Sequence, residues 1–115
     1  MKAIGISNPY TSGKVYIIWE IPHDKINGFE VYRDNKLIAS SFSEEGLHVF
    51  IPPTMFDHDH HTNLFKKDST YQLMYVDEDV YRYQHYKYEV VAIRKNEDGT
   101  IMERIQSESI YIDAM

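Results

Sequence analysis

The run DHDHH at residues 57–61 places five side chains that can ligate a metal ion next to one another. Zinc needs three or four ligands that converge on one point, with each imidazole oriented by a further partner. On a helix, either Asp57 and His61 or His58 and His61 would be spaced to chelate. On an extended strand, His58 and His60 would share one face, opposite the other three side chains. No single conformation turns all five inwards, so the run predicts only a weak metal site, at Asp57, His58 and His61.

Catalytic motifs are missing around this run and along the rest of the sequence. The run is similar to the His-x-His-x-Asp-His pattern of metallo-hydrolases, but Thr62 and Asn63 stand where Asp and His are needed. It also lacks the His-Glu-x-x-His helix of metalloproteases, and no nucleophile elbow or phosphate-binding glycine loop occurs elsewhere. The acidic run 77–79 (DED) lacks the spacing of a calcium loop and indicates a solvated turn. We therefore expect no catalytic residue, no enzyme and no cofactor; a metal-dependent site through 57–61 is the less favoured alternative.

Composition narrows the classes of partner. The net charge of −6 argues against nucleic acid, which needs a basic stripe, and against an anionic membrane surface. There is no cysteine, so disulfides and thiolate chemistry are excluded. The first residues lack the apolar core of a signal peptide, and no apolar run approaches the ~20 residues of a membrane span. We expect a single soluble domain, residues 1–115, that is either cytoplasmic or one module of a longer exported protein.

The secondary-structure elements that would position any site are predicted to be short strands. Residues 14–22 (KVYIIWEIP) alternate apolar and other side chains with period two until Pro22, which is typical of a strand with one face on a core. Residues 86–93 (YKYEVVAI) and 107–113 (SESIYID) repeat the pattern. Turns are predicted at Asp34-Asn35-Lys36 and at 96–100 (NEDGT), where Gly99 can take a positive φ. Many short strands with turn signals between them predict an all-β sandwich or barrel.

Three ordered motifs resemble a fibronectin type III domain. The segment VYIIWEIP supplies the buried Trp at the end of that family's second strand, and GFEVYRDNKLIA supplies its third strand and turn. The segment YVDEDVYRYQHYKYEVVAI matches its later signature, with Tyr86 at the position of the tyrosine corner, whose hydroxyl bonds to backbone a few residues upstream. The resemblance covers about residues 3–42 and 70–113. It implies an immunoglobulin-like sandwich of about seven antiparallel strands, whose core consists of Val15, Ile17, Trp19, Phe29, Val31, Tyr88, Val90, Ala92, Ile110 and Ile112.

The sequence departs from the fibronectin type III pattern at two places. The usual Pro-Gly before Tyr86 is replaced by Arg82, Tyr83 and Gln84. A longer insertion, residues 43–69, separates the third-strand region from a strand that starts near Ser69, and it contains the histidine run. Within it, residues 47–51 could add a strand, and a capping pattern from Thr54 to Asp57 predicts a short helix over 55–66.

Tyrosine is the most abundant aromatic residue, and some tyrosines are candidates for binding. Tyr75, Tyr86 and Tyr88 fall on core or corner positions, which leaves Tyr71, Tyr81 and Tyr83 for exposure. Exposed aromatic rings anchor protein partners or stack on sugars. The predicted contact surface therefore comprises these three tyrosines with Phe56 and His60 of the insertion.

The function that the resemblance implies is a non-catalytic interaction or spacer module. Such domains occur in larger bacterial or viral surface or secreted proteins, which would make the location extracellular or surface-associated. The expected partner is a protein or a glycan, with neither nucleic acid nor membrane. A carbohydrate-binding module that uses exposed tyrosines is the alternative. A monomer is favoured, although a strand at 47–51 could pair with a second copy at a sheet edge.

Overall fold

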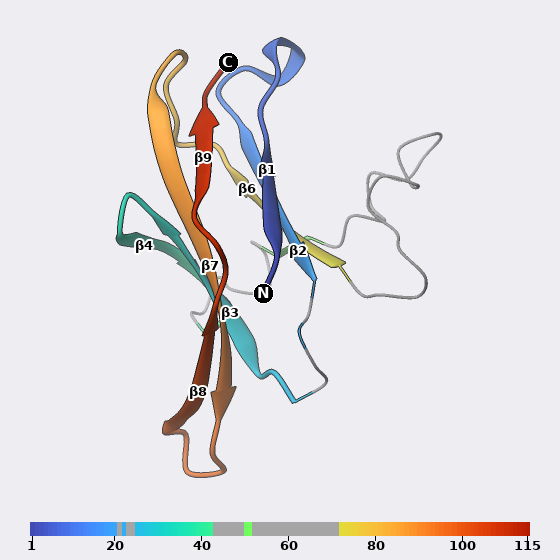
Figure 1. Ribbon diagram of the computed structural model, residues 1–115, viewed down its shortest axis with the longest axis vertical. Helices are drawn as coiled ribbons and strands as arrows, with labels where there is room; N and C mark the ends of the chain where they lie inside the picture. Colours follow the sequence, from blue (N-terminus) through green and yellow to red (C-terminus); the bar gives the residue numbers. More distant parts are fainter. Residues whose placement is uncertain (21, 23–24, 43–49, 52–71) are drawn as a thin grey trace.

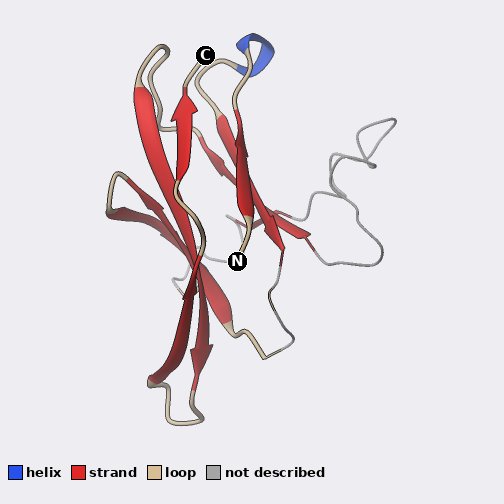
Figure 2. Cartoon of the chain, viewed as in Figure 1, coloured by secondary structure: helices blue, strands red, loops and turns tan. Residues whose placement is uncertain are grey.

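The computed structural model describes residues 1–20, 22, 25–42, 50–51 and 72–115, and in them the chain is almost entirely β-structure (Figures 1 and 2). One short 3-10 turn, η1 (Pro9–Thr11), follows the first strand. The described residues form nine strands, which are β1 (Ala3–Ile6), β2 (Val15–Glu20), β3 (Gly28–Arg33), β4 (Lys36–Ser40), β5 (Phe50–Ile51), β6 (Gln72–Asp77), β7 (His85–Lys95), β8 (Ile101–Gln106) and β9 (Ile110–Asp113).

The strands form two antiparallel sheets, so the predicted all-β sandwich is confirmed. The first sheet has the order β1-β2-β6-β5, and the second has the order β4-β3-β7-β8, with β9 also paired to β7. The count exceeds the predicted seven partly because the last strand region is interrupted. Ser107 lies in the gap, where its Oγ accepts a hydrogen bond from Val90 N at 2.9 Å and thus replaces a backbone acceptor of the ladder.

The core lies between the sheets and contains the side chains that the period-two pattern predicted. Val15, Ile17 and Trp19 of β2 pack against the second sheet, and the Trp19 and Phe29 ring centroids lie 5.5 Å apart. Nine of the ten predicted core residues are buried, and Ile112 is partly buried against them. Burial of one such large side chain contributes about 1.5–3 kcal/mol, which makes this cluster the main stabilising feature.

Alternation does not describe the outer faces of the sheets completely. Ile18 lies between two core positions of β2, and Met74 is its register partner on β6, yet both are buried. Val91 and Ile93 on β7 are buried in the same way. The prediction that one face of each strand packs while the other meets solvent is therefore wrong at these positions.

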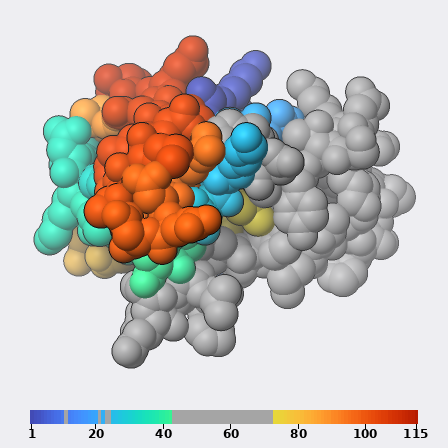
Figure 3. All heavy atoms as spheres, turned by 90° about the horizontal axis from the view of Figure 1, so that it is seen from below, coloured from blue at the N-terminus to red at the C-terminus, as the bar shows by residue number. Residues whose placement is uncertain are grey.

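Both predicted turns are confirmed. Asp34 and Asn35 form a two-residue connection with φ of 50° and 67°, as a type I′ hairpin requires. Gly99 closes the β7–β8 hairpin with φ of 89°. This hairpin faces the viewer in the space-filling view from below (Figure 3).

The insertion lies mostly outside the described residues. The helix predicted over 55–66 falls there entirely. Of the strand predicted over 47–51, the described residues are Phe50 and Ile51, which form β5 and pair with Tyr75 and Met74 of β6. The strand therefore extends the chain's own sheet at this point.

Candidate functional site

The predicted site residues divide into two groups. Asp57, His58 and His61 of the metal prediction lie outside the described residues. So do Phe56, His60 and Tyr71 of the predicted contact surface. Tyr81 and Tyr83 are described, and their exposed fractions are 73% and 74%, as the sequence predicted.

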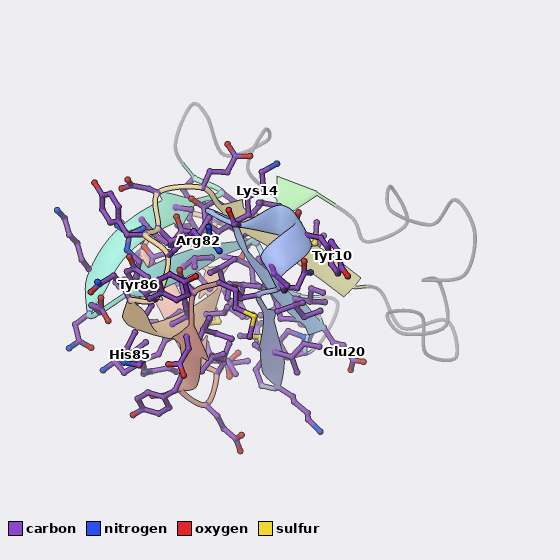
Figure 4. All side chains as sticks on the ribbon, turned by 90° about the horizontal axis from the view of Figure 1, so that it is seen from above. Tyr10, Lys14, Glu20, Arg82, His85 and Tyr86 are labelled. Carbon is purple, nitrogen blue, oxygen red and sulfur yellow. The ribbon has the colours of Figure 1, made fainter. Side chains whose placement is uncertain are left out.

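A third exposed tyrosine, Tyr10, belongs to the same end of the sandwich. The strands β1 and β6 both run antiparallel to β2, so the loops that follow them emerge at one end. An ion pair of 3.6 Å between Lys14 Nζ and Glu78 Oε1 bridges these two loops. Figure 4 looks down on this end, with Tyr10, Lys14 and Arg82 labelled. We call the surface formed by Tyr10, Tyr81, Arg82 and Tyr83 the tyrosine end.

Sequence reasoning missed Tyr10, whose exposed fraction is 95%. The available signal was the dipeptide Asn8-Pro9 directly before it. The Asn8 side chain accepts a hydrogen bond from Tyr10 N at 3.0 Å, which is the local turn that Asn favours. This turn leaves the Tyr10 ring directed into solvent.

A buried charged cluster supports the loop that carries Tyr81 and Tyr83. Arg33 Nη1 donates to both carboxylate oxygens of Asp77, at 3.0 and 2.8 Å, and the Tyr88 hydroxyl donates to Asp77 Oδ2 at 2.7 Å. Arg33 also donates to the Asp79 carbonyl oxygen at 3.2 Å, and Asp79 N donates to Asp77 Oδ1 at 3.1 Å. These bonds join β3, β6 and β7 directly below the loop and fix where it starts.

The interpretation of residues 77–79 as a solvated turn is wrong for Asp77. Its exposed fraction is 1%, and a carboxylate so buried is stable only when it is paired. The cluster also acts on Tyr88: burial first, and then the hydrogen bond and charge of Asp77, raise the pKa of its hydroxyl far above the ordinary 10.0. Tyr88 therefore stays a neutral hydrogen-bond donor throughout the physiological pH range.

The hydroxyl of Tyr86 fixes the middle of the loop. It accepts a hydrogen bond from Tyr81 N at 2.8 Å, five residues upstream. This is the bond expected from the tyrosine-corner position. The guanidinium of Arg33 lies 5.9 Å from the centre of the Tyr86 ring, which connects the corner to the buried cluster.

Tyr83 has an unusual backbone conformation, with φ of 66°. Left-handed backbone is costly for a bulky L-residue and persists only where surrounding contacts enforce it. Here Tyr83 N donates to Ala114 O at 2.6 Å, and Ala114 N donates to Gln84 O at 2.9 Å. The chain end after β9, together with a turn bond from Gln84 N to Tyr81 O at 3.3 Å, thus holds Tyr83 in this conformation with its ring exposed.

Arg82 adds a cation beside the exposed ring. Its guanidinium lies 5.1 Å from the centre of the Tyr83 ring, and its Nη2 donates to the Tyr83 hydroxyl at 3.1 Å. Rings and guanidinium groups held in this way can bury apolar area and donate hydrogen bonds to a partner. The arrangement is suited to binding.

Two further findings concern metals and membranes. Among residues 1–20, 25–42 and 72–115, no three His, Asp or Glu side chains are arranged to hold a metal ion. Across the described part of the chain, no helix has the length and apolar character needed to cross a membrane.

Comparison with known proteins gives a fold relative. No protein-family model matches the chain, and no curated protein matches it either. A solved structure with a similar fold is the Family 28 exopolygalacturonase of Yersinia enterocolitica, with a TM-score of 0.51 and 18% sequence identity. The match covers 89% of this chain but 18% of the enzyme's chain, so this chain spans less than a fifth of that protein. At this identity the likeness shows the fold alone.

Proposed function

We propose that this chain is a non-catalytic, fibronectin-III-like interaction module that binds a protein partner through the tyrosine end. The observation that carries the proposal is Tyr83, a large exposed ring on left-handed backbone, which is held by the turn bond from Gln84 N to Tyr81 O and by the long-range bond to Ala114 O. An unfavourable conformation at a position where glycine would fit better favours a role for the side chain itself. Tyrosine and arginine are also the residues most enriched at the energetic centres of protein interfaces.

The family assignment within this proposal is supported by the motifs and by strand order. A first sheet with order β1-β2-β6-β5 facing a second that contains β3, β7 and the last strands is the arrangement of immunoglobulin-like sandwiches. The Tyr86 bond to Tyr81 N adds the corner expected of them. The match to less than a fifth of a larger enzyme chain supports a module that accompanies other domains. We further propose that the parent protein is a bacterial or viral surface or secreted protein.

A photo-crosslinking experiment tests this proposal. A benzoylphenylalanine residue replaces Tyr83 in the parent protein, and a second variant carries it at Glu97, an exposed position of the β7–β8 hairpin. After irradiation in the organism that encodes the protein, we expect a discrete protein adduct from position 83 and none from position 97. The adduct should be lost when Tyr10→Ala and Tyr81→Ala are added.

Two results would count against the proposal. Equal adducts from both positions would indicate non-specific contact. An adduct that persists without Tyr10 and Tyr81 would show that these two rings are not needed for the contact, against a binding surface formed by the tyrosine end. Size-exclusion chromatography with light scattering should show a monomer in isolation, since the proposed partner is a different protein.

A further inference from the structure

A hollow of about 330 Å³ lies at the second sheet, where β7, β9 and the β3–β4 turn meet. The register pairs His85 with Asp113 and Lys87 with Tyr111, so these four side chains share the sheet face that points away from the core. Asp34 of the turn completes the polar rim, and Tyr86 and Ile112, which alternate with these residues along the two strands, also line the hollow. We call this feature the β9 hollow; it borders the tyrosine end but uses different side chains.

Hydrogen bonds fix the polar groups of the β9 hollow. Asp34 N donates to Lys87 O at 2.7 Å, and Lys87 N donates to Asp34 Oδ1 at 3.0 Å. The Lys87 ammonium donates to Asn35 Oδ1 at 2.7 Å, and His85 Nδ1 bonds to Asp113 Oδ1. A rim that is ordered before a ligand arrives reduces the entropy cost of binding.

The charges of the rim select the class of ligand. The carboxylates of Asp34 and Asp113 and the ammonium of Lys87 give the rim charges of both signs, and Lys87 Nζ also lies 3.5 Å from Glu89 Oε1. A charged ligand would meet a like charge at one of these positions, whereas a neutral ligand rich in hydroxyl groups can donate to the carboxylates and accept from the cation. Hydrogen bonds to charged groups are the stronger ones, so such a ligand would be held effectively.

Tyr111 supplies the apolar contact that such a ligand needs. Its exposed fraction is 75%, although it belongs to a strand whose neighbours Ile110 and Ile112 face the core cluster. A pyranose ring combines an apolar C–H face with hydroxyl groups around its edge. An aromatic ring beside fixed carboxylates meets both requirements. The volume is at the lower end of the usual range of ligand pockets, which suits a single sugar ring.

We propose that the β9 hollow is a binding site for a neutral pyranose, either free or as one unit of a glycan. This site is independent of the proposed protein contact at the tyrosine end. One sugar ring has few atoms and the hollow is open, so we expect millimolar affinity for monosaccharides.

Nuclear magnetic resonance titration of the ¹⁵N-labelled chain tests the site. The probes are the methyl pyranosides of glucose, galactose, mannose and N-acetylglucosamine, followed by a glycan array. We expect saturable shifts at His85, Lys87, Tyr111 and Asp113 with at least one probe. Tyr111→Ala should weaken binding by about tenfold or more, and Tyr83→Ala, the matched control at the tyrosine end, should leave it unchanged.

Three outcomes would overturn the proposal. The first is a blank glycan array together with the absence of a saturable shift for every pyranoside. The second is binding that survives both Tyr111→Ala and Asp113→Asn. The third is a set of shifts that map to the tyrosine end. Because Tyr111 and Asp113 are exposed, both variants should fold, and their amide spectra verify this before titration. A failed crosslink at Tyr83 with intact sugar binding would refute the proposed function alone.

Discussion

The β7–β8 hairpin and the β6–β7 loop each contain one residue with positive φ. The two residues differ in side chain and in the hydrogen bonds that support them. The hairpin uses Gly99, with φ of 89° and no atom within 4 Å of where a Cβ would lie. Its turn is closed by local bonds, such as Asn96 N to Thr100 O at 2.8 Å. The loop uses Tyr83. Its turn also has a local bond, from Gln84 N to Tyr81 O at 3.3 Å, but a further bond runs from Tyr83 N to Ala114 O, far along the chain.

The two regions deal differently with the strain of a positive φ. Residues next to one another in sequence determine the hairpin, so glycine removes the strain at no cost to packing. In the loop, a local turn bond and the distant bond to Ala114 together hold a residue that raises the energy of the backbone. Backbone strain at an exposed tyrosine is understandable if the ring takes part in binding. This contrast between the two regions is the basis for proposing the tyrosine end as the contact surface.

Among these variants, removal of the buried Asp77 carboxylate below the loop should cause the largest loss in the free energy of unfolding. Asp77→Ala leaves Arg33 without its buried carboxylate partner and the Tyr88 hydroxyl without its acceptor, so we expect a loss of about 3–5 kcal/mol in the free energy of unfolding. Urea denaturation followed by Trp19 fluorescence measures it. Asp98→Ala in the exposed hairpin is the control and should cost much less. Comparable losses from the two variants would contradict the distinction between the two regions.

Alkaline pH should weaken the same cluster. The raised pKa of Tyr88 means that the folded chain keeps a proton that the unfolded chain gives up near 10.0. Unfolding then releases a proton, so this contribution to stability is complete below pH 10.0 and is lost as pH rises beyond it.

The variant Tyr88→Phe tests this linkage. It should cost about 1.5–3 kcal/mol at neutral pH, because a hydrogen bond to a charged acceptor is lost. It should also reduce the slope of unfolding free energy against pH in the strongly alkaline range. Tyr75, whose pKa is also raised, first by burial, should keep the slope from vanishing. An unchanged slope would show that Tyr88 does not carry the effect.

A substitution at Gly99 tests the hairpin directly. Gly99→Ala forces an L-residue into left-handed backbone with no steric clash, so we expect a loss of about 1–2 kcal/mol from backbone strain alone. Thermal unfolding with calorimetry measures it. Gly99→Asn is the matched variant and should lose less, since Asn tolerates this conformation. Equal losses from Ala and Asn would argue for a cause other than φ.

The opposite substitution in the loop should have the smallest effect on stability. In Tyr83→Gly, relief of about 1–2 kcal/mol of backbone strain is offset by the entropy of glycine, about 0.5–1 kcal/mol, and by the lost contact with Arg82. We expect the free energy of unfolding to rise by less than about 1 kcal/mol, while the partner identified by crosslinking no longer binds to the variant in a pull-down. A clear loss of stability would mean that the Tyr83 side chain supports the fold.

The fold was predictable because it follows from local alternation. The pattern from Val15 to Trp19 placed β2 and its core face, and Gly99 placed a hairpin. The burial of Ile18 and Met74 was not predictable, because both lie on the face that alternation assigns to solvent. What buries them depends on how segments distant in sequence pack, which a period-two pattern does not contain.

The candidate site was predictable only in part. The exposure of Tyr81 and Tyr83 was predicted by elimination, because Tyr75, Tyr86 and Tyr88 fell on core or corner positions. The partner of Asp77 did not, because Arg33 is 44 positions away and three consecutive acidic residues suggest a solvated turn. The conformation of Tyr83 was not predicted either, since one of the two bonds that hold it runs to Ala114 at the far end of the chain, and the other closes a turn without a glycine.

The hydrogen bonds of Ala114 with Tyr83 and Gln84 have a practical consequence for anyone who attaches this domain to a surface. Ala114 is buried, and Met115 N donates to Ser7 Oγ at 3.0 Å, so the last residues are fastened among the loops of the tyrosine end. In Figure 1 the C-terminus lies beside those loops, whereas the N-terminus lies at the far end of β1. A tag or resin linked to the C-terminus would shield the tyrosines and disturb the bond that holds Tyr83. Immobilisation through the N-terminus leaves both the tyrosine end and the β9 hollow open to a ligand in solution.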